Sequence, residues 1–315
     1  MVKKTVVLRK LIASGETLLR PLVGIALQAQ MAEALGYKVV GISGAYTAAH
    51  ILGMPDAGLI TMTEMVENTR RICNATTIPV IADADTGFGN AVNVRRTVQE
   101  MMQAGAAAIF MEDQVAPKRC GFVKGKEVIS REEAIGKVRA AVDTRNEVDK
   151  DFVIMARTDA LTAVGGSLDE AIWRANAYRD AGADIIYVEA VTTREQIKKL
   201  RANIKGPLAC SAWDIEPYPT LKELNELGLC MTLGLMYFEA GLVADWDMLM
   251  ALKEKGLEYF YEWRAAHKEH PARWQKIYDL VGFPKVREWE EKYLPKKELD
   301  KYDKSSGLYD PKAKK

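Results

Sequence analysis

One pattern recurs along this chain and limits its fold more than any other feature. A helical stretch with an apolar face leads to a glycine, and a short apolar run that ends at a polar residue follows. Glycine at a helix end readily takes the positive φ that terminates the helix. The pattern occurs at residues 31–43, 101–113, 178–190 and 224–234. Further apolar runs, which bring the expected strands to eight, lie at residues 19–26, 76–85, 151–159 and 205–214.

These apolar runs are continuous rather than alternating, which indicates strands buried on both faces, as in a parallel sheet covered by helices. Eight such units in roughly 240 residues favour a closed barrel over an open doubly wound sheet. No GxGxxG motif follows the first run, which argues against a dinucleotide-binding fold. We therefore predict an α/β fold in which residues 1–245 form a (β/α)₈ barrel of the TIM type.

The sequence changes character after residue 245. Residues 246–295 are expected to form a helical extension that is rich in tryptophan and tyrosine, and such a surface is typical of a subunit interface. Residues 296–315 are polar and poor in apolar side chains, so we expect a flexible tail.

Composition excludes several classes of function. The 44 lysines and arginines nearly balance the 43 aspartates and glutamates, so no overall field favours nucleic acid or an anionic membrane surface. No run reaches the ~20 apolar residues that a membrane helix needs. The four cysteines form no CxxC pair, which argues against a zinc site or a disulfide framework. We expect a cytoplasmic protein with reduced thiols that acts on a small molecule.

The ends of the predicted strands carry most of the chemistry. In a barrel of this type the functional face lies at the C-terminal ends of the strands. Acidic side chains dominate there, and one arginine stands among them. The residues, in strand order, are Ser43, Gly44 and Ala45, then Asp83 and Asp85, Glu112 and Asp113, Arg157 and Asp159, Glu189, and Ser211 to Asp214.

Carboxylates that converge on one barrel mouth repel one another unless a hard divalent cation holds them, and oxygen ligands favour Mg²⁺ or Mn²⁺ over Zn²⁺. The alternative is that these aspartates cap helices or join ion pairs. Two roles also fit Arg157, namely a fork for a substrate carboxylate or an ion pair with Glu189 or Asp159. The amides after Ser43 open a helix and could bind a carboxylate oxygen.

Histidine is nearly absent from the predicted barrel, where only His50 occurs. Cys120 is instead the candidate proton donor or nucleophile, in the polar, glycine-containing segment 114–130. We expect Lys118, Arg119 and Lys124 to lower the pKa of its thiol. The alternative is an inert, half-buried thiol.

Three motifs in order, "DADTGFGN" (83–90), "MEDQVAPKRCG" (111–121) and "FVIMARTDA" (152–160), resemble the isocitrate lyase and phosphoenolpyruvate mutase superfamily. The resemblance covers about residues 20–240. The chain is most similar to the methylisocitrate lyase-like branch, which includes 2,3-dimethylmalate lyase. The resemblance implies a (β/α)₈ barrel with Mg²⁺, a mobile gating loop with the Lys-Arg-Cys-Gly motif, and helix-swapped dimers that assemble into homotetramers.

The matching motifs also imply roles for individual residues. The metal site would be formed, directly or through water, by Asp56, Asp83, Asp85 and Glu112. The 2-oxo acid part of the substrate would be held by Ser43, Gly44, Ala45 and Arg157. Cys120 would protonate the departing carbanion, and Glu189 and Lys118 would assist. The rest of the substrate would contact Gly121, Phe122, Ser211 and Trp213.

Two departures from the family pattern bear on the substrate. Phe122 stands where the tricarboxylate lyases usually have histidine, and Trp213 stands near a position where they have an asparagine-containing motif. An apolar distal pocket would suit a smaller or more hydrophobic substituent. We expect a lyase that cleaves a substituted malate, such as 2,3-dimethylmalate, to pyruvate or a related 2-oxo acid and a short carboxylate. The alternatives are a 2-methylisocitrate lyase, an oxaloacetate hydrolase and a catalytically silent relative.

Overall fold

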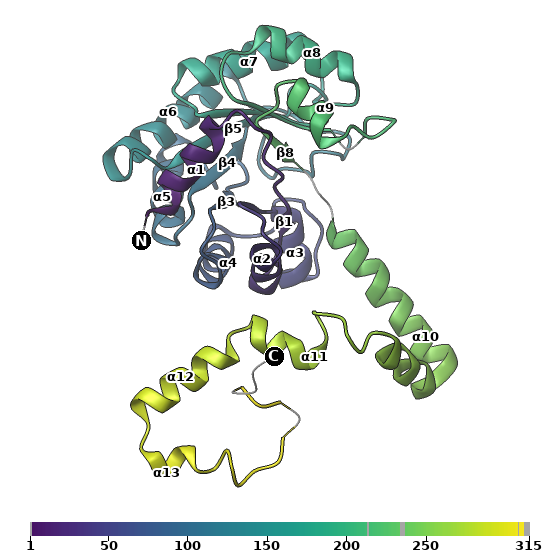
Figure 1. The fold of residues 1–315 in the computed structure, drawn as a ribbon. Coiled ribbons are helices and arrows are strands. Elements are labelled where there is room, and N and C mark those ends of the chain that lie inside the picture. The colour runs from purple at the N-terminus through teal and green to yellow at the C-terminus, as the bar shows by residue number, and fades with distance from the viewer. Residues whose placement is uncertain (1, 213, 234–236, 308, 312–315) are drawn as a thin grey trace. The chain divides into compact units, whose positions relative to one another are not determined.

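The computed structural model describes residues 2–212, 214–233, 237–307 and 309–311. The chain divides into two compact units, residues 1–238 and 239–315 (Figure 1). The first unit contains all the strands and the second contains only helices and connecting segments among its described residues.

Eight parallel strands in sequential order form the centre of the first unit. Their bounds are β1 Leu22–Val23, β2 Val40–Ile42, β3 Val80–Asp83, β4 Ala108–Glu112, β5 Val153–Thr158, β6 Ile185–Val188, β7 Leu208–Ser211 and β8 Met231–Leu233. Leu18, just before β1, forms a parallel bridge with Met231 of β8. Its N–H donates to the Cys230 carbonyl (3.0 Å), and its carbonyl accepts from the Thr232 N–H (2.8 Å). This bridge joins the last strand to the first, as the predicted barrel requires.

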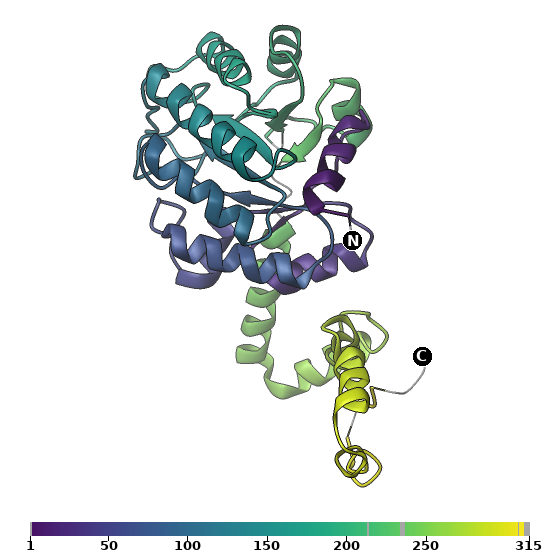
Figure 2. The ribbon, with the colours of Figure 1, turned by 90° about the vertical axis from the view of Figure 1, so that its left-hand side faces the viewer.

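Helices lie outside the strands (Figures 1 and 2). They are α1 Lys4–Ala13, α2 Ala26–Ala34, α3 Gly44–Leu52, α4 Met62–Ala75, α5 Ala91–Gln103, α6 Arg131–Val148, α7 Leu168–Asp180, α8 Arg194–Asn203 and α9 Leu221–Glu226. Glycines with positive φ follow several of these helices; Gly105 (φ 93°) and Gly182 (φ 102°) are two of them. The recurrent helix–glycine–strand pattern therefore predicted the (β/α)₈ fold correctly, with two helices between β2 and β3.

The core of this unit has two parts. One packs the outward side chains of the strands, such as Val80, Ile109 and Ile154, against the helices. The other fills the barrel interior with residues that include Ile81, Phe110 and Met155, and Leu8 of α1 belongs to it. Because side chains alternate along each strand, the polar residues at the strand ends stand above this interior cluster.

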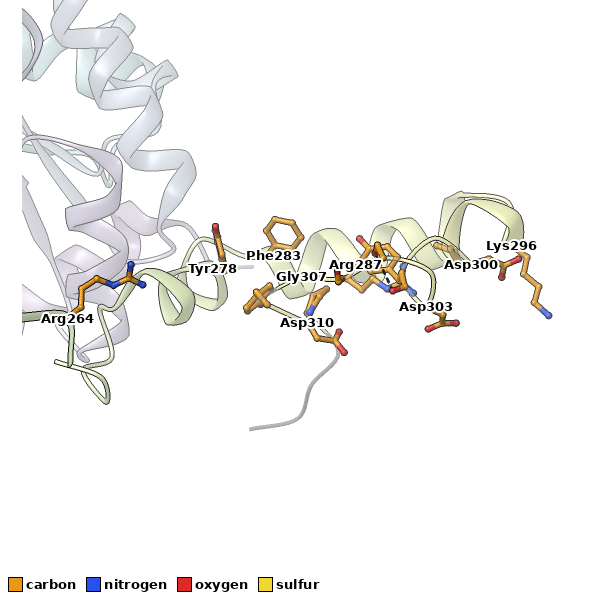
Figure 3. Close-up of a pocket in the computed structure, with 15 residues that line it drawn as sticks. Arg264, Tyr278, Phe283, Arg287, Lys296, Asp300, Asp303, Gly307 and Asp310 are labelled. Carbon is orange, nitrogen blue, oxygen red and sulfur yellow. Dashed lines mark hydrogen bonds between the residues drawn. The ribbon is translucent and has the colours of Figure 1, made fainter. Parts of the chain in front are cut away.

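The second unit is helical. Its helices are α10 Tyr237–Ala266, which is kinked at Gly256 (φ 71°, ψ −164°), α11 Trp274–Leu280, α12 Phe283–Tyr293 and α13 Lys296–Leu299. The expected boundary at residue 245 falls within α10, since this helix starts at Tyr237. Arg287 Cζ lies 3.8 Å from the Tyr302 ring centroid. Together with Arg264 and Phe283, Arg287 lines a cavity of about 950 Å³ (Figure 3).

No helix among the described residues is both long and apolar enough to span a bilayer.

Asp184 provides a test of how the first unit is held together. It pairs with Arg145 of α6 (2.6 Å) and Arg9 of α1 (3.2 Å), and accepts the Ile154 N–H of β5 (2.8 Å). We expect Asp184→Ala to lower the free energy of unfolding by about 3 kcal/mol in urea denaturation, because it leaves Arg145 largely buried without its partner. Glu147→Ala, which breaks an exposed pair with Arg95, is the control and should cost less than about 1 kcal/mol. Equal losses would contradict this account.

Candidate active site

The residues predicted at strand ends lie together at the C-terminal ends of the strands. Asp83 ends β3, Glu112 ends β4, and Glu189 directly follows β6. Glu112 pairs in register with Arg157 of β5, and Arg157 with Tyr187 of β6. Parallel neighbours in register bring their side chains to the same height in the barrel.

An acidic cluster, made of Asp56, Asp83, Asp85 and Glu112, surrounds one lysine. The Lys118 ammonium donates to Asp56 and lies 3.1 Å from Asp85 Oδ1, and its side chain is 4% exposed. Asp83 accepts the N–H groups of Gly44 (2.7 Å) and Asp85 (2.9 Å). Burial raises the pKa of Asp85 to about 6, against the opposing effect of Lys118. Lys118 therefore supplies the positive charge that this cluster needs.

The oxygens of the acidic cluster match the ligands of a hard cation. Both carboxylate oxygens of Asp85 and of Glu112 are buried without a hydrogen-bond partner in the described part of the chain, although Lys118 and Arg157 lie within ion-pair distance. Buried carboxylate oxygens of this kind are the donors that Mg²⁺ prefers. Among the described residues no three acidic, histidine or cysteine side chains are arranged to hold a metal as they stand. The donor chemistry fits, and Lys118 lies among the donors.

Arg157 is the second buried cation of the site. It donates to both oxygens of Asp159, from Nε and Nη2, at 2.9 Å each. It also lies 3.2 Å from Glu112 and 3.8 Å from Glu189. The ion pair with Asp159 and Glu189 is thus present. Burial raises the pKa of Asp159, but Arg157 and Lys126 outweigh it and hold that pKa below its usual value.

Asp113 supports Arg157 from behind, a role that the strand-end pattern did not predict. Its carboxylate accepts from the Asp159 N–H (2.9 Å), Thr158 Oγ1 (2.7 Å) and Tyr178 Oη (2.6 Å), and pairs with Arg174 (3.3 Å). Asp113, which directly follows β4, therefore fixes the backbone at Asp159, and Asp159 in turn holds Arg157. The signal in the sequence was only that Asp113 adjoins Glu112.

Glu189, which follows β6, is a buried carboxylate on the side of Arg157 away from Glu112. Its Oε2 accepts a hydrogen bond from the Tyr187 hydroxyl, and burial raises its pKa. Ser211 Oγ accepts the N–H of Ala190 at 2.7 Å, so this predicted substrate residue supports the chain that follows Glu189. The period of two along β6 places Tyr187 and Glu189 on one face, and this signal could have identified Tyr187.

The segment 114–130 lies against these residues. The Cys120 N–H donates to the Asp56 carbonyl at 3.0 Å. A Cβ on Gly121 would lie 2.3 Å from Glu189 Oε1 and 2.7 Å from Arg157 Nη2, so only glycine permits this approach. Lys126, buried and not predicted, donates to the Gly121 carbonyl and, at 3.1 Å, to Asp159. The segment is therefore closed over Arg157 and Glu189.

The prediction that the pKa of the Cys120 thiol is lowered is wrong. Burial raises the pKa of its thiol, and the smaller opposing effects of Arg157 and Lys118 do not reverse this. Lys118 is engaged by carboxylates, while Arg119 and Lys124 are exposed. Cys120 is consequently a protonated thiol near neutral pH, suited to donate a proton rather than to attack as a thiolate.

The remaining predicted substrate residues lie at the start of α3 and in the segment 114–130. Ser43 is the N-cap of α3, where its Oγ accepts the Tyr46 N–H (3.3 Å), and Ala45 lies in the first turn. Phe122, next to Gly121, has 41% of its surface exposed. Trp213 lies outside the described residues.

Comparisons with known proteins agree with this geometry. The family model described as phosphoenolpyruvate phosphomutase matches residues 8–234. The 2,3-dimethylmalate lyase of Eubacterium barkeri is 42% identical over 91% of this chain and 96% of its own. The 2-methylisocitrate lyase of Aeropyrum pernix is 41% identical over 80% of each chain. A phosphonopyruvate hydrolase structure in complex with oxalate and Mg²⁺ has a TM-score of 0.81 at 31% identity, covering 93% of this chain and all of that one.

The fold and the site of buried carboxylates together define an enzyme of the (β/α)₈ barrel class. The chain belongs to the phosphoenolpyruvate mutase/isocitrate lyase superfamily. Within it, the chain is a carbon–carbon lyase, as its lyase relatives indicate.

The raised pKa of Cys120 predicts the pH dependence of its alkylation. Only the thiolate reacts with iodoacetamide, so the rate at Cys120, followed by mass spectrometry, should keep rising above pH 9. A free cysteine peptide, whose thiol has an ordinary pKa of about 8.5, should level off earlier. A midpoint for Cys120 below that of the peptide would contradict the structure.

Proposed function

We propose that this enzyme is a Mg²⁺-dependent lyase that cleaves an alkylmalate, such as 2,3-dimethylmalate, to a 2-oxo acid and a short carboxylate. The observation that carries the proposal is the segment 114–130, which brings Gly121 against Arg157 and Glu189 and holds the protonated thiol of Cys120 next to it. A half-buried acid, a buried base and a buried guanidinium within one closed site suit cleavage between two anionic fragments.

The chain's own residues account for the proton movements. Glu189, whose pKa is raised by burial, would accept the hydroxyl proton of the substrate. The bond between the hydroxyl carbon and its neighbour then breaks, leaving a 2-oxo acid and a carboxylate carbanion. The thiol of Cys120 gives its proton to that carbanion, and Arg157 stabilises the negative charge of the 2-oxo acid. Closure of the segment excludes water, which strengthens the interaction of Arg157 with the negative charge that develops.

The acidic cluster is the proposed metal site. Asp85, Glu112 and Asp83 would hold Mg²⁺, or Mn²⁺, with Asp56 acting through water. Bound there, the cation would polarise the hydroxyl and oxo oxygens of the substrate. The buried oxygens of Asp85 and Glu112 support this placement, and so does the Mg²⁺ present with oxalate in the phosphonopyruvate hydrolase complex. Lys118 would have to share or leave the cluster when the cation enters.

The alkylmalate assignment depends on the distal end of the site. Phe122 borders Gly121 in the closed segment and would offer the substrate an apolar ring rather than a hydrogen bond. The similarity to the Eubacterium barkeri lyase over nearly the whole chain supports the same choice. The second candidate is 2-methylisocitrate, favoured by the similarity to the Aeropyrum pernix enzyme.

The second unit is proposed to assemble the enzyme as a homotetramer of helix-swapped dimers. Helix α10 has no fully buried residue among those described. Its exposed side chains include Leu242, Trp246, Leu249 and Leu257, which are 52%, 72%, 68% and 62% exposed. An apolar helix surface of this extent is typical of a subunit interface.

The proposed function is tested by release of 2-oxo acid from a panel of substrates. The panel holds 2,3-dimethylmalate, 2-methylisocitrate, isocitrate and oxaloacetate, each with Mg²⁺. We expect kcat/KM for 2,3-dimethylmalate to exceed that for 2-methylisocitrate at least about tenfold, and kcat to fall about 100-fold or more in Cys120→Ser.

Cys73→Ser, which alters a buried thiol outside the site, is the matched control and should retain activity. Preference for 2-methylisocitrate would overturn the role of Phe122 while leaving the lyase reaction in place. Acetate and oxalate from oxaloacetate alone would identify a hydrolase instead.

A further inference from the structure

Arg20 is a buried cation that the proposed reaction does not use. It lies just before β1, and 1% of its surface is exposed. Its Nε and Nη1 have no hydrogen-bond partner within the described part of the chain. Its backbone N–H donates to Thr232 Oγ1 at 3.0 Å, which ties it to β8. Two buried guanidinium nitrogens without a direct partner are costly and require an explanation.

The interior of the barrel makes room for this side chain. A Cβ on Gly41 of β2 would lie 2.2 Å from Arg20 Nη1, so a side chain at residue 41 would displace the guanidinium. Arg20 Cζ lies 5.7 Å from the centroid of the Phe110 ring, which belongs to the interior cluster. Arg20 is thus located within the packed interior, one layer below the strand ends.

A column of groups connects Arg20 with the site above it. The Phe110 ring meets the Tyr187 ring edge to face, with centroids 6.2 Å apart. Arg157 Cζ lies 5.3 Å from the centroid of the same Tyr187 ring. The rings of Phe110 and Tyr187 therefore link Arg20 to Arg157 through successive contacts.

Arg20 remains charged at neutral pH and faces acidic groups. Burial lowers its pKa to about 10, against the opposing effects of Tyr187, Asp83, Cys230 and Glu189. The field of a cation decays slowly through an apolar interior, because little solvent screens it there. The acidic mouth of the barrel therefore receives positive potential from below as well as from Arg157.

A purely structural role would not require the charge. An apolar side chain would fill the same volume without the desolvation cost, and such replacements of buried charges are often neutral or stabilising. The charge itself is what distinguishes Arg20 from the Ile81 and Met155 side chains that share the interior.

We propose that Arg20 is a positioning residue that raises the electrostatic potential of the site from inside the barrel and so favours binding of an anionic substrate. The identity of that substrate rests on the proposed function. The effect of Arg20 on the potential at the site does not.

The test uses Cys120 as a probe of local potential. Its thiolate displaces iodide from iodoacetate, an anion, or from iodoacetamide, which is neutral and of similar size. The ratio of the two rates cancels the fraction of thiolate and most of the effect of access. We expect the ratio of the iodoacetate rate to the iodoacetamide rate, measured at Cys120 by mass spectrometry, to fall about threefold or more in Arg20→Met. In Arg20→Lys this ratio should stay near the wild-type value.

Arg145→Met is the matched control, since it breaks a largely buried ion pair with Asp184, which precedes β6 at the opposite end from Glu189. It should lower Tm and leave the ratio unchanged. An unchanged ratio in Arg20→Met would overturn the proposal. Should Arg20→Met fail to fold, Arg20→Gln replaces it; failure of both neutral variants beside a folded Arg20→Lys would also overturn it, because the charge would then serve folding.

Oxalate binding with Mg²⁺, measured by calorimetry, separates this proposal from the proposed function. We expect the Kd of oxalate to rise on the order of tenfold in Arg20→Met. Absence of oxalate binding in the wild type would count against the proposed function, while the alkylation ratio would still decide the role of Arg20.

Discussion

The site depends above all on the balance between buried carboxylates and the few cations placed among them. Lys118 lies within the acidic cluster, and Arg157 is held between Asp159, Glu112 and Glu189. Carboxylates buried in this number would be protonated or would repel one another without such partners. The barrel provides the convergence, because parallel strands in register place their last side chains at one height.

The same balance links the segment 114–130 to the strand ends. Lys118 and Lys126 anchor the two sides of this segment on carboxylates of the barrel, and Gly121 allows the backbone between them to touch Glu189. Cys120 is carried to the site by these anchors and is protonated because it becomes buried there. Closure, charge and the state of the thiol are therefore parts of one arrangement.

Sequence alone predicted the barrel and most of the strand-end residues, because burial on both faces and the helix–glycine–strand repeat are local signals. Asp83, Glu112, Arg157 and Glu189 could be located by their place after apolar runs. The interaction partners of these residues could not be predicted in this way. Whether Lys118 contacts Asp56 or Cys120 depends on how the long connection after β4 folds over the barrel. For the same reason the pKa of Cys120 was predicted with the wrong sign, and Arg20 carried no signal at all, since its isolation appears only inside the assembled barrel.

We propose that the acidic cluster is a divalent-cation site and that Lys118 neutralises its charge when no metal is bound. The most direct test is the Kd of Mn²⁺, obtained from the electron paramagnetic resonance signal of the free ion. We expect Asp85→Asn to weaken Mn²⁺ binding about tenfold or more, because it removes a buried ligand charge, and Lys118→Met to strengthen it, because a competing cation is lost. Lys124→Met, in the exposed part of the same segment, should bind Mn²⁺ as the wild type does. Mn²⁺ binding that neither Asp85→Asn nor Lys118→Met alters would contradict the account.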